Sequence, residues 1–187
     1  MTSNKHNPKR VLAIDPTSRG FGYVVLESPT TLVDWGGKVI RDQNEAKTLA
    51  KLSELIRHYG PEIIVLEDPR ESRRCARIQS LLDGVCRLAT EEGIESRRVP
   101  ISRVKKVFHA FRATTKHEIA QVIAQQLPEL APQLPRYRKA WMSEGYGMAF
   151  FDAAALALTY FHFRLLRTAG APQARPMAEN LKRSELV

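Results

Sequence analysis

The stretch that decides the fold is Arg10-Val-Leu-Ala-Ile-Asp-Pro-Thr-Ser-Arg-Gly-Phe-Gly-Tyr-Val-Val-Leu-Glu27. Its apolar run at 11–14 is rich in branched side chains and predicts a buried strand. Asp15 ends this strand, and a segment with proline and two glycines predicts a turn into a second strand at 23–26. A carboxylate at the end of a buried strand is unfavourable unless it is solvated, paired or bound to a cation. Asp15 therefore either opens a solvated turn or belongs to a charged site.

A second aliphatic run repeats this pattern. Residues 63–66 are Ile-Ile-Val-Leu, and Glu67 follows them directly. A helix predicted at 44–59 would join the two strands by a right-handed crossover and make them parallel neighbours. We therefore expect Asp15 and Glu67 to leave the sheet at the same edge.

The remaining pattern predicts an α/β fold. A strand at 32–40 would complete an antiparallel meander, and a strand at 94–100 would extend the parallel part, giving a five-stranded mixed sheet flanked by helices. Helices are predicted at 72–92, 102–108, 116–127 and 149–168. The last helix is apolar over its first turns except for Asp152, so this helix packs on the sheet and can bring Asp152 to the other two acids.

The predicted helix at 72–92 begins among arginines. Arg70, Arg73, Arg74 and Arg77 are spaced i, i+3, i+4 and i+7, so they are expected to share one face, which is either a phosphate-binding surface or a solvated one. The chain has a net charge of +9 and a pI near 9.8, which favours a polyanionic partner, nucleic acid before membrane.

Length and composition predict one domain at 10–168, with disordered tails at 1–9 and 169–187. The polar start carries no signal-peptide core, and no apolar run approaches the roughly 20 residues of a membrane span. Cys75 and Cys86, both in one predicted helix, would lie about 16 Å apart, too far for a disulfide. We therefore expect reduced thiols, a cytoplasmic location and no membrane partner.

Three clustered carboxylates need cations at neutral pH. Oxygen-rich sites of this kind suit Mg²⁺ or Mn²⁺. Two such ions about 4 Å apart form the arrangement used for phosphodiester hydrolysis. Asp15, Glu67 and Asp152 thus predict a divalent-metal site for phosphoryl chemistry.

The opening motif, Asp15-Pro-Thr-Ser-Arg-Gly-Phe-Gly-Tyr23, resembles that of the RuvC Holliday junction resolvases of the ribonuclease H superfamily. That family opens with Asp-Pro-Gly-Ser-Arg, two variable residues and Gly-Tyr. The resemblance continues at Ile64-Val-Leu-Glu67, at Lys105 and Lys116 with the family's spacing, and at Asp152-Ala-Ala-Ala-Leu-Ala157. It covers residues 10 to 165, approximately the whole predicted domain.

The resemblance implies a ribonuclease H-like fold and a homodimer that cuts four-way DNA junctions with two Mg²⁺ ions per site, for which Mn²⁺ can substitute. It makes Asp15, Glu67 and Asp152 metal ligands, and it puts Lys105 and Lys116 beside the scissile phosphate. Other contacts to nucleic acid are expected from Ser18, Arg19 and the four arginines at 70–77.

The chain departs from the family at three places. Ala149 stands where the family has an acid or a histidine, so the site either works with three carboxylates, uses Glu144 as well, or is impaired. Arg70 stands where the family often has an aromatic residue. The glycines before the second lysine are absent, with Ala110 and Arg112 near their place.

Two other functions stay open. The same fold could carry a nuclease for structured RNA or an RNA–DNA hybrid, or a DNA-binding dimer that lost its activity with the acid at Ala149. A sugar kinase or ATPase also begins with a strand and an Asp, but 187 residues are too few for its second phosphate-binding half. The sequence does not say whether a branch-migration partner exists.

Overall fold

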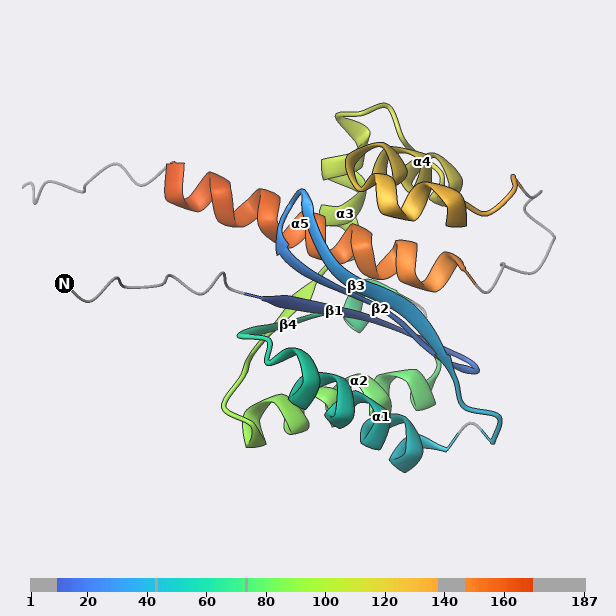
Figure 1. Ribbon diagram of the computed structural model, residues 1–187, viewed down its shortest axis with the longest axis vertical. Coiled ribbons are helices and arrows are strands. Elements are labelled where there is room, and N and C mark those ends of the chain that lie inside the picture. Colours follow the sequence, from blue (N-terminus) through green and yellow to red (C-terminus); the bar gives the residue numbers. More distant parts are fainter. Residues whose placement is uncertain (1–9, 43, 73, 138–146, 170–187) are drawn as a thin grey trace, which may run out of the picture.

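A computed structural model describes residues 10–42, 44–72, 74–137 and 147–169. The predicted tail at 1–9, residues 170–187 of the second tail, Arg73 and Glu144 lie outside these described residues. A sheet forms the middle of three layers, with α1 and α2 on one face and α3, α4 and α5 on the other (Figure 1). The strands are β1 Val11–Thr17, β2 Gly20–Ser28, β3 Thr31–Val39, β4 Ile63–Glu67 and β5 Glu95–Val99. The helices are α1 Glu45–Tyr59, α2 Ala76–Glu91, α3 Ile101–His109, α4 Lys116–Gln126 and α5 Met148–Ala169, with 3₁₀ turns at Pro69–Glu71 and Pro128–Gln133.

The sheet has the predicted mixed topology. Its strand order is β3-β2-β1-β4-β5, with antiparallel pairing among the first three strands of the chain and parallel pairing of β4 with β1 and β5. The crossover helix α1 begins where Asn44 accepts a hydrogen bond from the Lys47 amide at 2.9 Å, and ends at Gly60, whose φ of 53° suits glycine. The predicted α/β fold with a five-stranded mixed sheet is therefore confirmed.

Both faces of β1 are buried, which explains its continuous apolar run. Leu12 and Ile14 pack in the core on the α1–α2 side, and Val11 and Ala13 pack in the core on the α5 side. All four side chains are fully buried. A strand covered by helices on both sides has no polar face, so its sequence does not alternate.

The helix α5 packs closely on the sheet at Gly22. A Cβ placed on Gly22 would lie 2.3 Å from the backbone carbon of Ala149, so only glycine admits the helix at this distance. The stretch Met148–Arg167 is long and apolar enough to cross a membrane, which the sequence did not lead us to expect. In this fold 56% of that window is buried, and α5 serves as the core helix that covers β2 and β1.

The first hairpin turns later than predicted. Asp15 does not end the strand, because β1 continues to Thr17 and Asp15 pairs with Gly22 across the hairpin. The parallel pairing with β4 extends only to the Ile14–Leu66 pair. Pro16, which has no amide hydrogen, therefore lies where β1 has become an edge strand, and proline is tolerated there.

The helix predicted at 72–92 begins later, at Ala76. Asp68 caps a 3₁₀ turn that Pro69 begins, and the chain is then extended at Ser72 and Cys75. Arg70 and Arg74 consequently do not share a helical face with Arg77, and that prediction is wrong. Cys75 is the residue before α2 and not part of the helix that holds Cys86; both thiols are free.

Candidate active site

Asp15 and Glu67 lie side by side at one edge of the sheet. Because Ile14 and Leu66 are matched in the parallel pairing of β1 and β4, the residues that follow them are neighbours. Both acids are buried, with 3% and 5% of their surfaces exposed. The recurrence of an aliphatic run followed by an acid thus correctly indicated that these two side chains meet.

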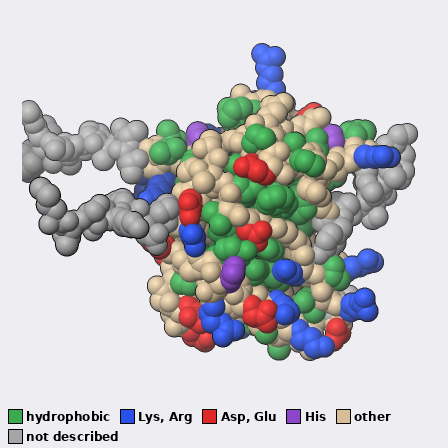
Figure 2. Space-filling model, viewed as in Figure 1, with side chains coloured by type: hydrophobic (Ala, Val, Ile, Leu, Met, Phe, Trp, Pro, Cys, Tyr) green, Lys and Arg blue, Asp and Glu red, His purple; other side chains and the backbone are tan. Residues whose placement is uncertain are grey.

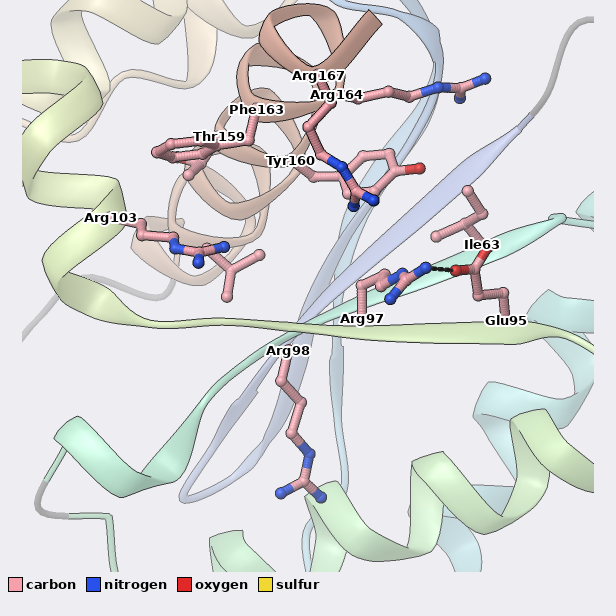
Figure 3. Close-up of a pocket in the computed structure, with 11 residues that line it drawn as sticks. Ile63, Glu95, Arg97, Arg98, Arg103, Thr159, Tyr160, Phe163, Arg164 and Arg167 are labelled. Carbon is pink, nitrogen blue, oxygen red and sulfur yellow. Dashed lines mark ion pairs between the residues drawn. The ribbon is translucent and has the colours of Figure 1, made fainter. Parts of the chain in front are cut away.

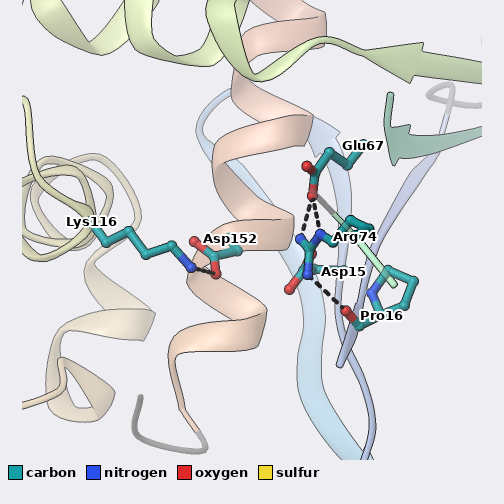
Figure 4. A network of polar contacts seen from close by, with 6 residues as sticks. All are labelled: Asp15, Pro16, Glu67, Arg74, Lys116 and Asp152. Carbon is teal, nitrogen blue, oxygen red and sulfur yellow. Dashed lines mark hydrogen bonds and ion pairs between the residues drawn. The ribbon is translucent and has the colours of Figure 1, made fainter. Parts of the chain in front are cut away.

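Arg74 lies between the two carboxylates (Figure 4). Its Nη2 donates to Asp15 Oδ1 at 2.7 Å, and its Nε donates to Glu67 Oε2 at 2.9 Å; Nη2 also contacts Glu67 Oε2. Its Nη1 donates to the Pro16 carbonyl at 3.3 Å. Arg74 was expected on a helix face that either binds phosphate or is solvated, but in this structure it is the counter-ion of the buried acid pair.

Asp152 reaches the same region from α5. Its Oδ2 accepts a hydrogen bond from Lys116 Nζ at 3.0 Å, and Figure 4 shows this pair beside the Asp15–Arg74 contact. Asp152 is less buried than the strand acids, with 24% of its side chain exposed. Asp152 is near enough to Asp15 to act on it electrostatically, and its role as a third metal ligand stays a prediction.

A capping box fixes the start of α4, and with it Lys116. Thr115 Oγ1 accepts from the Glu118 amide at 3.2 Å, and Glu118 Oε2 accepts from the Thr115 amide at 2.9 Å. Hydrogen bonds from the Thr114 and Thr115 backbone hold the pKa of Glu118 down at about 2. Lys116 is the first residue of this capped helix and projects toward α5.

The three acids interact electrostatically. Burial, and after it the negative charge of Asp152, raises the pKa of Asp15 to about 7, while Arg74 acts in the opposite direction. Glu67 raises the same pKa further, and Lys116 lowers it. Burial is thus the main reason for the raised pKa of Asp15, and the neighbouring charges act on it in both directions.

The donor set suits a hard cation. Within the described ranges, no three His, Cys, Asp or Glu side chains converge closely enough to hold one ion together. Asp15 and Glu67 nevertheless already share one cation, the Arg74 guanidinium, and carboxylate oxygens are the ligands that Mg²⁺ prefers. A metal would fit between them once Arg74 is released, with Asp152 as a third ligand once Lys116 is released.

The other predicted contacts to nucleic acid have different surroundings. Arg77 Nη2 donates to the carbonyls of Thr17 and Ser18 at 3.2 and 2.6 Å, so it ties α2 to the first hairpin. Ser18 and Arg19 are exposed at the tip of this hairpin. On the face shown in Figure 2, basic and acidic side chains are interspersed over the α1–α2 layer.

Asp68 is a buried acid that sequence reasoning did not select. It is 2% exposed, and hydrogen bonds from Arg70 lower its pKa. Arg70 Nη2 lies 2.6 Å from Asp68 Oδ2, while the Arg70 side chain is 85% exposed. The sequence feature that could have indicated Asp68 is its position directly after Glu67, at the end of the same buried strand.

Lys105 does not join the carboxylates. It is exposed on α3, and no ion pair connects it to an acid in the described part of the chain. Of the two lysines selected by spacing, only Lys116 contacts an acid of the cluster.

No family model and no curated protein matches the chain. Solved structures do match: Thermus thermophilus RuvC in complex with a Holliday junction substrate superimposes with a TM-score of 0.61 at 20% identity, covering 84% of this chain and 96% of the other. The Thermus thermophilus RuvC structure matches with the same TM-score and identity, covering 83% and 96%. Identity at this level shows the fold alone. The chain has the ribonuclease H-like fold of the RuvC Holliday junction resolvases.

Proposed function

We propose that the protein is a divalent-metal-dependent endonuclease that resolves four-way DNA junctions. The observation that carries this proposal is the meeting of Asp15 and Glu67 at one sheet edge, with Asp152 near enough to raise the pKa of Asp15. The shared fold with a resolvase solved on its junction, and the net charge of +9, support a branched DNA substrate.

In this proposal Asp15, Glu67 and Asp152 hold the Mg²⁺ ions, two per site, and Mn²⁺ can replace them. Divalent ions, when bound, would supply Lewis-acid chemistry for phosphodiester hydrolysis. The chain itself provides the rest. Asp15 must lose its proton to act as a ligand, and Lys116, released from Asp152, donates hydrogen bonds to the charge that develops on the phosphate.

Arg74 has a defined part in this proposal. In the metal-free protein it compensates the buried acids. When metal takes that place, the guanidinium becomes available to a DNA phosphate next to the cut, because a planar guanidinium pairs well with phosphate oxygens. Its side chain is already 29% exposed, so it can leave the acid pair without crossing the core.

Two symmetric cuts in one junction require two active sites, so we propose a homodimer. We also propose that the protein acts in the cytoplasm, where its DNA substrate is. We propose no branch-migration partner. The domain at 10–168 with disordered tails at 1–9 and 169–187 stays a prediction. The same holds for Glu144 as an additional metal ligand and for Arg73 as a contact to nucleic acid.

Two observations favour a second candidate, a junction-binding dimer without activity. Ala149 supplies no carboxylate one turn before Asp152, and Arg74 already occupies the space between the two strand acids as their shared counter-ion. A nuclease for structured RNA or an RNA–DNA hybrid would use the same residues on another substrate.

One gel experiment separates these candidates. Labelled four-way junction, linear duplex and RNA–DNA hybrid are incubated with the protein in Mg²⁺ or EDTA, with Asp15→Asn as the control for contaminating nuclease. We expect paired cuts in the junction, in Mg²⁺ only and not with Asp15→Asn. Cleavage of the hybrid alone would favour a ribonuclease, and a junction that shifts on a native gel but stays uncut would favour the inactive binder.

A further inference from the structure

A cavity of about 570 Å³ lies at the sheet edge formed by β5, bounded by β5, α3 and the second half of α5 (Figure 3). It does not include Asp15, Glu67 or Asp152. A volume between roughly 300 and 1,000 Å³ is typical of small-molecule sites. The cavity is therefore large enough for a ligand of nucleotide size.

The lining of this cavity is strongly basic. Five arginines line it together with one acid, Glu95; without Arg98, which pairs with Asp83, the excess is three positive charges, from Arg97, Arg103, Arg164 and Arg167. Arg97 forms an ion pair with Glu95 within the cavity wall. A concave surface that gathers cations attracts an anion, and the arginine fork suits phosphate oxygens in particular.

Arg98 is not part of this excess, although it belongs to the same strand. Figure 3 shows its side chain turned away from the other arginines. It pairs instead with Asp83 of α2, on the opposite face of the sheet. Successive side chains of a strand point to opposite faces, so the guanidinium of Arg97 lies on the cavity side and that of Arg98 on the α2 side, although Arg98 also borders the cavity.

A buried hydroxyl in the cavity wall gives a second, independent indication of a ligand. Thr159 is 0% exposed, and its Oγ1 finds no hydrogen-bond partner among the described residues. Burying a hydroxyl without a partner costs roughly 1–3 kcal/mol in proteins, so such groups are rare. A ligand oxygen would satisfy this hydroxyl once the groups that cover it move aside.

Aromatic rings complete the wall. The Arg103 guanidinium lies 5.1 Å from the centre of the Phe163 ring, and Tyr160 lines the cavity one residue after Thr159. Stacking occupies the flat face of a guanidinium and leaves its N–H groups free to bind in the plane. Arginine edges for a phosphate and a tyrosine ring for a base are thus present in the same cavity.

We propose that this cavity binds a nucleotide, with its phosphate on Arg97, Arg103 and the Thr159 hydroxyl and its base against Tyr160. The nucleotide is either free or part of a DNA strand held by the protein; the phosphate chemistry is the same in both. The site is separate from the carboxylate cluster and does not depend on cleavage.

The test uses fluorescently labelled dATP (the mant derivative) and the full-length protein in EDTA, so that no metal enters the carboxylate site. Binding is followed by fluorescence anisotropy. We expect saturable binding that Arg103→Gln and Arg97→Gln each weaken roughly 10-fold or more, as for a lost charge-assisted hydrogen bond. The matched control is Arg57→Gln, an exposed arginine on α1 in the opposite layer, which should bind like the parent. Arg97 is 54% exposed, so its replacement leaves the fold intact.

Thr159→Val separates a binding role from a structural one. Valine keeps the shape and removes the hydroxyl, so nucleotide affinity should fall while the Tm of the unliganded protein stays equal or rises. An unlabelled single-stranded 20-mer then identifies the source. Displacement of the label by the 20-mer assigns the site to a DNA strand, and displacement by dATP alone assigns it to a free nucleotide. Absence of binding, or equal affinity of the parent and both arginine variants, overturns the proposal.

Discussion

One guanidinium nitrogen of Arg74 lies 2.7 Å from the carboxylate of Asp15, at a position where only 4% of the Asp15 side chain is exposed. The protein thus carries its own cation at the edge of the sheet. This cation comes from the extended segment before α2, which is outside both strands that supply the acids. It stabilises the metal-free fold, and it competes with any metal for the same oxygens.

Replacing Arg74 by glutamine should destabilise the metal-free protein and increase its response to Mg²⁺. Removing one partner of a buried ion pair leaves an uncompensated charge and costs on the order of 3 kcal/mol. Because a ligand stabilises the state that binds it, Mg²⁺ should raise the Tm of Arg74→Gln more than that of the parent. Thermal melts in EDTA and in Mg²⁺ measure both effects, with Arg57→Gln as the control. Equal melting of Arg74→Gln and parent in EDTA would contradict the counter-ion role.

Stability in EDTA should fall as the pH rises toward 7. The pKa of Asp15 is about 7 in the fold, against about 3.9 for a free aspartate, so between these values the folded state binds more protons than the unfolded state. The amount that protonated Asp15 adds to the free energy of unfolding is complete below about pH 4 and is lost as the pH passes through 7. Urea denaturation at several pH values measures this slope, which Asp15→Asn should reduce. A parent and an Asp15→Asn variant with the same slope would show that another group titrates.

Lys116→Ala should slow cleavage much more than it weakens binding. A donor aimed at charge that develops in the transition state affects rate and not ground-state affinity, and its loss typically costs about 100-fold or more. Single-turnover cleavage at saturating protein measures the rate, and Lys106→Ala, exposed on α3, is the control. Cleavage by Lys116→Ala at the parental rate would refute this role. Lys105→Ala in the same assay tests the second lysine.

Asp152→Asn should abolish cleavage while junction binding is kept or tightened. The amide preserves the volume of the side chain and removes one negative charge that faces the phosphate. It also removes a charge that raises the pKa of Asp15, so the metal-free protein should melt at a higher temperature. Gel shifts, cleavage assays and melts with and without Mg²⁺ cover these expectations. If Asp152→Asn cuts DNA and keeps the parental Tm response to Mg²⁺, Asp152 is no ligand.

Gly22→Ala should disturb the site from a distance. Its Cβ would meet the Ala149 backbone at 2.3 Å, so α5 must move away from the sheet, at a typical cost of about 1–3 kcal/mol for overpacking. Asp152 moves with the helix, and both Tm and the Mg²⁺ response should fall. Gly93→Ala is a poor control because of its φ of 67°, whereas Gly84→Ala, whose Cβ meets only flexible side-chain ends, isolates the effect of adding a methyl group. A Gly22→Ala protein that melts like the parent would show that the helix can move without loss.

The strands and their acids were predictable because their signals are local. The runs before Asp15 and Glu67 are apolar on both faces, and a crossover between parallel strands allows one arrangement. Asp152 was equally visible as one charge in an apolar helix. The neighbouring positions of Asp15 and Glu67 could therefore be predicted without coordinates, while the assignment of all three acids to one metal site stays a prediction.

Arg74 was placed wrongly because periodicity assumes a continuous helix. The arginine spacing from 70 to 77 fits one face, but Pro69 and the extended residues Ser72 and Cys75 interrupt the helix. The backbone contact between Gly22 and Ala149 was not predictable either, since it depends on how two distant elements pack. Local pattern reveals which charges are present, and only packing decides which of them meet.

The helix α5 fixes the distance between the carboxylate cluster and the arginine-lined cavity. Thr159 and Phe163 lie about two and about three turns after Asp152, so the three residues share one face of a single unbroken helix. At about 1.5 Å per residue, Phe163 lies roughly 16 Å along the axis from Asp152. That span is close to five nucleotide steps of about 3.4 Å each on one DNA strand. If a DNA strand is cut beside Asp152 and anchored in the arginine-lined cavity, the length of α5 sets the number of nucleotides between the two points. Lengthening α5 by one turn would then shift the cut by about one to two nucleotides.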